Sequence, residues 1–95
     1  MDSELLIHGG DVIGPRDVQL GADLLIRNRK IVRIARKIRR PSSACRVIDA
    51  RRGFVAPGLI DLQVNGAAGV MFGACHADEI PRVSRCLAAH GVTGY

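Results

Sequence analysis

The residues best suited to chemistry follow a short apolar segment near the middle of the chain. Residues 59–64 are mostly apolar and β-permissive, which predicts a short strand buried on both faces. Two amide side chains, Gln63 and Asn65, stand where it ends, followed by Gly66 and Gly69. Barrel enzymes present substrate-contacting residues in this way, at the end of an apolar strand and in the loop that follows. The alternative is a core strand that simply runs into a polar turn.

Amide side chains donate and accept hydrogen bonds, but they are poor ligands for zinc compared with His, Cys or carboxylate. Gly66, with Gly69, would let the loop backbone approach a sugar phosphate. We therefore expect Gln63, Asn65 and Gly66 to bind substrate or to support a metal site through hydrogen bonds. No catalytic residue and no metal ligand is expected in this chain. Asp61 is interpreted as a structural acid bonded to nearby backbone or to an arginine.

Three stretches carry a family resemblance. Residues 56–61 (Ala-Pro-Gly-Leu-Ile-Asp) resemble the segment that opens the catalytic barrel of the amidohydrolase superfamily, most of whose members continue with His-x-His. Here those positions hold Gln63 and Asn65, within Asp-Leu-Gln-Val-Asn-Gly-Ala-Ala-Gly-Val-Met-Phe (61–72), which is similar to the N-acetylglucosamine-6-phosphate deacetylases. Residues 90–95 (His-Gly-Val-Thr-Gly-Tyr) fit the same family. Arg29 and Ala67-Ala68 depart from it, since relatives often carry glycine at the first position and more glycine or bulk at the second.

The resemblance implies an α/β fold, an incomplete metal-dependent amidohydrolase. Residues 1–56 would be part of an N-terminal β-sandwich. Residues 57–95 would be the first strand, loop and helix of a TIM-like (β/α)8 barrel, ending at the start of the second strand. The complete enzyme would hydrolyse N-acetylglucosamine 6-phosphate to glucosamine 6-phosphate and acetate in amino-sugar metabolism. Its divalent metal, zinc or a similar ion, would be held by residues outside this chain, so the 95 residues alone are expected to be inactive.

The same resemblance implies a small-molecule amino-sugar phosphate as partner and a homo-oligomeric complete enzyme. A cytoplasmic location without a membrane partner is expected because no apolar run approaches the roughly 18 residues that span a bilayer and the N-terminus is acidic. Nucleic acid is not expected as a partner. Another amidohydrolase, dihydroorotase-like or hydantoinase-like, is an alternative, although such enzymes are expected to have His at positions 63 and 65. A basic nucleic-acid-binding module is an alternative from a different class.

Composition supports a globular chain, because 47% of the residues are hydrophobic and 24% are charged. The net charge is +5, and no acid lies between Asp23 and Asp49. Nine cations lie in that interval: Arg27, Arg29, Lys30, Arg33, Arg36, Lys37, Arg39, Arg40 and Arg46. They alternate with apolar residues and no aromatic residue lies among them, which favours the wet side of a half-buried sheet over a base-stacking platform. The three cysteines, Cys45, Cys75 and Cys86, are interpreted as reduced thiols.

Most of the N-terminal half is expected to form a small antiparallel or mixed β-structure. Gly9-Gly10 is expected to end the first strand, and Asn28-Arg29 to lie in the turn of a hairpin. A two-residue turn would hold Arg29 in a costly left-handed conformation, and a longer turn would avoid that cost. His8, without a partner at ligand spacing, is expected to be structural. The candidate strands are residues 5–7, 11–13, 23–27, 30–34 and 46–50.

A helix is predicted over residues 78–90. Pro81 is tolerated in its first turn, and Ile80, Val83 and Leu87 recur at helical spacing. Gly91 is well suited to end it. A strand, a loop, this helix and a new strand from Val92 together predict one βα unit of a parallel array.

Overall fold

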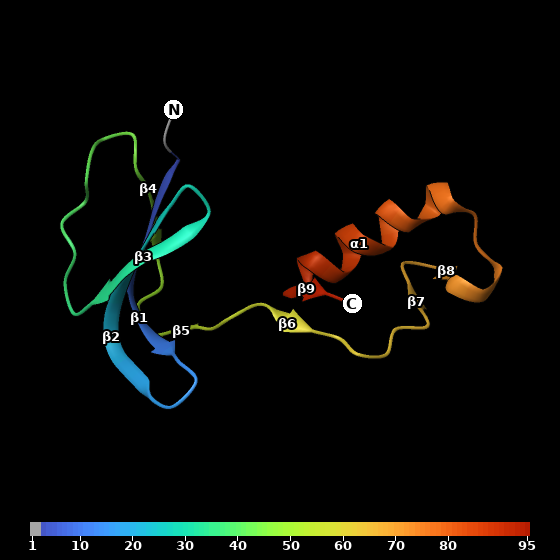
Figure 1. The fold of residues 1–95 in the computed structure, drawn as a ribbon, viewed down its shortest axis with the longest axis horizontal. Coiled ribbons are helices and arrows are strands. Elements are labelled where there is room, and N and C mark those ends of the chain that lie inside the picture. Colours follow the sequence, from blue (N-terminus) through green and yellow to red (C-terminus); the bar gives the residue numbers. More distant parts are fainter. Residues whose placement is uncertain (1–2) are drawn as a thin grey trace. The chain divides into compact units, whose positions relative to one another are not determined.

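The computed structural model describes residues 3–95, which form two compact units (Figure 1). The first unit ends at Ala56, and the second runs from Pro57 to Tyr95. The sequence analysis divides the chain between the same two residues. That the units are parts of a β-sandwich and of a barrel stays a prediction. Within the described residues, no helix is long and apolar enough to span a membrane.

The first unit is a mixed five-stranded sheet, which confirms the expected β-structure (Figure 1). The central strand β1 pairs antiparallel with β2 and parallel with both β4 and β5, while β3 pairs antiparallel with β2. The sheet order is therefore β3-β2-β1-β4, with β5 also beside β1. The strands are β1 (Glu4–Ile13), β2 (Val18–Arg27), β3 (Lys30–Ala35), β4 (Arg46–Asp49) and β5 (Phe54–Val55).

The expectation that Gly9-Gly10 ends the first strand is wrong. β1 continues through both glycines to Ile13, and the pairing with β2 shifts register on either side of Gly10. Gly9 has a φ of 75°, which costs glycine little and lets the strand bulge without ending. A Cβ on Gly10 would lie 2.8 Å from the Val55 side chain, so glycine also allows β5 to approach closely.

The sheet carries a small apolar cluster on each face. Because Leu24 and Leu25 are consecutive in β2, they point to opposite faces. Leu25 packs with Leu6, Ile38 and Cys45, and Leu24 packs with Val12 and Ala22.

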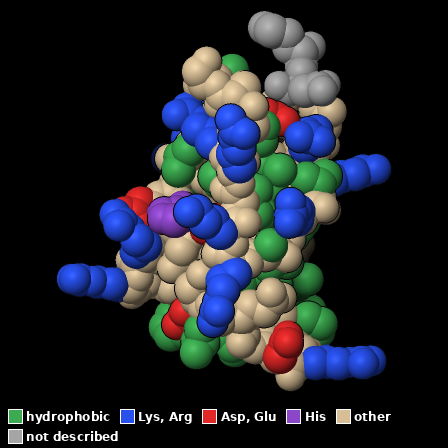
Figure 2. Space-filling view, turned by 90° about the vertical axis from the view of Figure 1, so that its left-hand side faces the viewer, with side chains coloured by type: hydrophobic (Ala, Val, Ile, Leu, Met, Phe, Trp, Pro, Cys, Tyr) green, Lys and Arg blue, Asp and Glu red, His purple; other side chains and the backbone are tan. Residues whose placement is uncertain are grey.

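The prediction that the cations between Asp23 and Asp49 are solvated is confirmed, since all nine are exposed, although the apolar residues of β3 up to Ile34 are exposed as well. Figure 2 shows Lys and Arg side chains spread over one side of the first unit, with hydrophobic side chains between them. β3 is last in the strand order, and its final residue, Ala35, packs against the cluster of Leu6, Leu25, Ile38 and Cys45.

The turn between β2 and β3 keeps the two-residue form that the sequence suggests. Arg27 and Lys30 are paired across it, and the two central residues both have positive φ, 49° at Asn28 and 66° at Arg29. The hairpin prediction is confirmed, and of the two turn lengths left open the structure has the two-residue turn with a left-handed Arg29.

Replacing Arg29 with glycine is therefore expected to stabilise the first unit. Removing the left-handed penalty should outweigh the extra unfolded-state entropy of glycine, raising the free energy of unfolding by about 0.5–1 kcal/mol. Urea unfolding followed by circular dichroism would measure the gain. Lys30→Gly, in the adjacent strand position, should lower stability instead. Equal destabilisation by both variants would contradict the argument.

The second unit combines very short strands with one helix (Figure 1). β6 pairs parallel with β9, and α1 lies between them in the sequence; β7 and β8 form an antiparallel hairpin. Two 3-10 turns, Phe72–Ala74 and Ala77–Glu79, precede the helix. The elements are β6 (Leu59–Ile60), β7 (Gly66–Ala67), β8 (Val70–Met71), α1 (Ile80–Ala89) and β9 (Val92–Gly94).

The helix prediction is confirmed, with a later start. α1 begins at Ile80 because the residues before it form a 3-10 turn, in which the Glu79 carboxylate accepts a 2.8 Å hydrogen bond from the His76 amide. Val83 is completely buried. Gly91, with a φ of 87°, follows the last turn in the left-handed conformation typical of a helix end.

The predicted buried strand over residues 59–64 is wrong in length and in burial. Only Leu59 and Ile60 pair, and they are 62% and 71% exposed. Leu62 is 95% exposed. The apolar composition indicated a buried strand, but within the described chain β9 is its one strand neighbour and nothing covers its faces.

Candidate functional site

The central segment is fixed at its start by β9. The Leu59 amide donates to the Gly91 carbonyl at 2.8 Å, and the Asp61 amide donates to the Gly94 carbonyl at 2.9 Å. The Asp61 carboxylate accepts a 3.1 Å hydrogen bond from the Gln63 amide, closing a local turn. Asp61 thus bonds nearby backbone, as its structural interpretation requires, although it is only half-buried.

Gln63 and Asn65 are both exposed, and the structure does not bring them to one site. The strand ends at Ile60, so the alternation that would point both amides the same way does not reach them. Asn65 and Gly66 together line a hollow of about 410 Å³, and Gln63 is not part of its lining. The backbone carbonyl of Asn65 accepts a 2.9 Å hydrogen bond from the Phe72 amide, which closes the β7–β8 hairpin.

Backbone conformation shapes this hollow. Ala68 and Gly69 turn the hairpin with φ values of 52° and 76°. Gly66 has a φ of 154°, and a Cβ there would lie 2.0 Å from the Val70 carbonyl oxygen, so only glycine fits. The full lining is Asn65, Gly66, Ala67, Gly69, Val70 and Met71.

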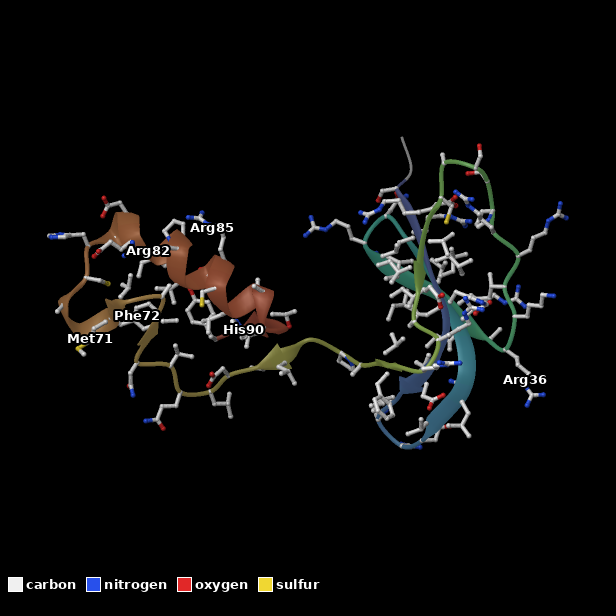
Figure 3. The ribbon with its side chains drawn as sticks, turned by 180° about the vertical axis from the view of Figure 1, so that it is seen from behind. Arg36, Met71, Phe72, Arg82, Arg85 and His90 are labelled. Atoms are coloured by element: carbon white, nitrogen blue, oxygen red, sulfur yellow. The ribbon has the colours of Figure 1, made fainter. Side chains whose placement is uncertain are left out.

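The lining suits binding and offers no reacting group. Asn65 supplies its one polar side chain, and Met71 projects outward from the hairpin with 69% of its surface exposed (Figure 3). The amide could fix a polar group of a small ligand while the apolar wall contacts its carbon atoms. No nucleophile, acid or base lies in this lining.

Aromatic stacking joins the end of the hairpin to Tyr95, the residue that follows β9. The rings of Phe72 and Tyr95 are parallel within 3°, with centroids 6.0 Å apart. The Tyr95 hydroxyl bonds the Ser84 hydroxyl on α1. Phe72 directly follows β8, so these contacts position one end of the hollow.

The residues described do not fit a metal ion. Gln63 and Asn65 are neutral amides, and residues 3–95 contain no group of three His, Cys, Asp or Glu side chains able to hold one. A divalent ion in a complete enzyme would need ligands other than these.

Sequence reasoning missed the most buried polar group, Asp23. It is 1% exposed, and its carboxylate accepts 2.9 Å hydrogen bonds from the amides of Gly9 and Ile38. His8 Nδ1 lies 2.8 Å from the same carboxylate, which gives His8 the structural role expected of it. The sequence signal for this buried acid was the position of Asp23 between Ala22 and Leu24, in a run of apolar residues.

Hydrogen bonding sets the charge state of Asp23. Burial raises its pKa, but the donors at Ile38, His8 and Gly9 together outweigh burial, and the pKa lies below its ordinary value. Asp49, on the surface, has its pKa held well below the usual range by hydrogen bonds from Arg51. Both carboxylates therefore stay ionised at neutral pH.

The chain resembles several known enzymes. It is 41% identical over 66 residues to a dihydroorotase of Anaeromyxobacter dehalogenans, covering 68% of this chain and 15% of that protein. It is 36% identical over 90 residues to a dihydroorotase of Streptococcus thermophilus, covering 94% and 20%. It is also 36% identical over 78 residues to a 5-methylthioadenosine/S-adenosylhomocysteine deaminase of Thermococcus onnurineus, covering 81% and 18%. No protein-family model matches the chain.

These relatives are enzymes of the amidohydrolase superfamily. The chain is similar to a part of each of these enzymes. It spans 20% or less of the length of the three relatives described. The names of these relatives support the coarse assignment and not the deacetylase reaction. Amidohydrolases of this kind are typically metal-dependent, and no metal site lies among the described residues.

Proposed function

We propose that the chain is the N-terminal part of a metal-dependent amidohydrolase that removes acetate from N-acetylglucosamine 6-phosphate. One feature of the sequence carries this proposal: Gln63 and Asn65 follow Ala-Pro-Gly-Leu-Ile-Asp (56–61), a segment resembling the one after which most amidohydrolases have His-x-His. Amide side chains at these positions bind metal poorly but donate and accept hydrogen bonds. This chemistry suits a segment that contacts a hydroxyl-rich substrate.

The hollow beside Asn65 supports the same proposal. Its volume of about 410 Å³ lies within the range of small-molecule sites. Gly66 lets the hairpin backbone approach the Val70 carbonyl closely, which shapes the hollow. The Asn65 side chain offers both a hydrogen-bond donor and an acceptor. A sugar has hydroxyl groups along its rim and C–H groups on its faces. The Asn65 amide could bond a hydroxyl group while the apolar wall of the hollow contacts a C–H face.

A dihydroorotase-like reaction is the second candidate, and the names of two similar proteins favour it. It requires a different use of this segment, since such enzymes are expected to carry His where this chain has Gln63 and Asn65. The two candidates differ in the bond hydrolysed, so substrate assays separate them.

The test uses the complete reading frame that contains these residues, purified with added zinc. We expect acetate release from N-acetylglucosamine 6-phosphate and no ring opening of dihydroorotate. Asn65→Ala should lower kcat/KM about tenfold to a hundredfold, the effect of losing one or two hydrogen bonds to substrate. Arg85→Ala, at an exposed helix position, should leave kcat/KM unchanged.

The pattern of activities decides between the candidates. Ring opening without acetate release would replace the deacetylase with the dihydroorotase-like reaction. Neither activity would remove both proposals. The 95-residue chain alone should release no acetate, because it carries no acid, base or metal ligand at the hollow.

A further inference from the structure

The backbone of Asn65 is held by Phe72. These two residues flank the β7–β8 ladder, in which Gly66 pairs with Met71, and the Phe72 amide donates a 2.9 Å hydrogen bond to the Asn65 carbonyl. Because each strand of this ladder has only two residues, the bond from Phe72 is a large part of what fixes Asn65. A shift of Phe72 therefore moves the residue that supplies the polar side chain of the hollow.

The consecutive side chains of Met71 and Phe72 have different surroundings. Met71 is 69% exposed and projects outward, whereas Phe72 is half-buried and lies on the side of the hairpin next to α1 (Figure 3). There its ring is parallel to the ring of Tyr95, with centroids 6.0 Å apart, a separation typical of offset-stacked rings. The orientation of Phe72 thus depends on where the Tyr95 ring stands.

A hydrogen bond to the helix fixes the Tyr95 ring in turn. The Tyr95 hydroxyl bonds the hydroxyl of Ser84, the neighbour in α1 of the completely buried Val83. Ser84 therefore sits on the part of the helix that is most firmly packed. All these contacts join residues of the second unit, so none of them depends on how the two units are arranged.

We propose that Tyr95 is a positioning residue for substrate binding and acts through Phe72 on Asn65. This inference rests on the proposed function, in which the Asn65 amide bonds a hydroxyl group of an amino-sugar phosphate. Neither Tyr95 nor Ser84 lines the hollow, so neither touches a ligand there. Their bond instead holds the Phe72 ring, and with it Asn65, in place before the substrate arrives.

Positioning and simple stabilisation of the fold predict different kinetics. A bond that only stabilises the fold changes the free energy of unfolding and leaves the KM of the folded enzyme as it was. A bond that positions Asn65 lowers KM, because without it the hairpin must be ordered as the substrate binds. The value of kcat should hardly change in either case, since Ser84, Tyr95 and Phe72 supply no acid, base or metal ligand to the hollow.

The test uses the complete reading frame, purified with added zinc, with N-acetylglucosamine 6-phosphate as substrate. Tyr95→Phe keeps the stacked ring and removes the hydroxyl, so KM should rise about threefold to tenfold with kcat within about twofold. Ser84→Ala removes the other partner of the same bond and should raise KM equally. The double variant should show no further rise, and Ser84→Thr, which retains a hydroxyl, should restore most of the natural KM.

A control variant separates this bond from the loss of any hydroxyl group. Ser42→Ala removes an exposed hydroxyl from the first unit and should leave KM unchanged. Additive effects of Tyr95→Phe and Ser84→Ala would show that the two hydroxyls act separately, and would overturn the proposal.

Amide hydrogen exchange of the same proteins gives a readout that does not depend on activity. Exchange at the Phe72 amide, which bonds the Asn65 carbonyl, should become at least about threefold faster in Tyr95→Phe and stay unchanged in Ser42→Ala. Unchanged exchange in Tyr95→Phe would overturn the proposal, and so would faster exchange with an unchanged KM. If the natural protein released no acetate, the proposed function would fail and this inference with it. If the natural protein were active and Tyr95→Phe had the natural KM, this inference alone would fail.

Discussion

Replacing Asp23 with alanine is expected to lower the free energy of unfolding of the first unit by about 3–5 kcal/mol. The buried carboxylate accepts hydrogen bonds from Gly9 and Ile38 and contacts His8, so alanine would leave buried donors without an acceptor. Those bonds join the β1 bulge, β2 and the segment after β3. Urea unfolding of the 95-residue chain at neutral pH measures the loss, and a change no larger than that of an exposed position would contradict it.

Measuring stability at acidic pH tests whether the charge of Asp23 causes this loss. Because its pKa is lowered in the folded unit, its contribution is present above the ordinary aspartate range, near about pH 4, and is lost as the pH falls through the folded-state pKa. The stability difference between the natural chain and Asp23→Asn should therefore shrink in acid. Asp49→Ala, at an exposed carboxylate paired with Arg51, should cause a much smaller loss at neutral pH. A difference independent of pH would show that the charge of Asp23 is not the cause.

Gly66→Ala is expected to open the β7–β8 hairpin and to cost the second unit about 2–4 kcal/mol. The new Cβ would meet the Val70 carbonyl at 2.0 Å, which is backbone and cannot swing aside, while φ is 154°. The pairing of Gly66 with Met71 should be lost first. Amide hydrogen exchange at Phe72, which bonds the Asn65 carbonyl across the hairpin, should become faster.

Gly69→Ala is the matched control for that variant. Gly69 also has positive φ, but no atom lies within 4 Å of its added Cβ. Alanine there should cost only the left-handed conformation, about 1–2 kcal/mol, with the hairpin kept. If the two alanine variants behaved alike, the close approach at Val70 would not be what requires glycine at position 66.

Short sequence patterns predicted the turns and helices whose formation depends on neighbouring residues. The Asn28-Arg29 turn and helix α1, with Pro81 in its first turn and Gly91 just after its end, depend on residues within a few positions, and both are present. The bulge at Gly9 and the burial of Asp23 depend on partners far along the chain, such as Ile38, which no local pattern specifies.

The candidate site shows the same division. The glycine at position 66 was recognised from its type, and the hairpin needs it. Gln63 and Asn65 were expected at the end of a strand over residues 59–64, whereas the strand ends at Ile60 and has β9 as its one neighbour within the described residues. An apolar sequence indicates that a segment favours burial, but it does not say which element provides the cover.

The short ladders of the second unit have a consequence for ligand binding. β6, β7 and β8 are two residues long each, so few backbone bonds must break for this stretch to open locally. A ligand bound beside Asn65, as proposed, would order the hairpin as it binds, and the lost conformational entropy would offset part of its contact energy. Any neighbouring segment that stiffens the hairpin beforehand removes that cost and strengthens binding without touching the ligand.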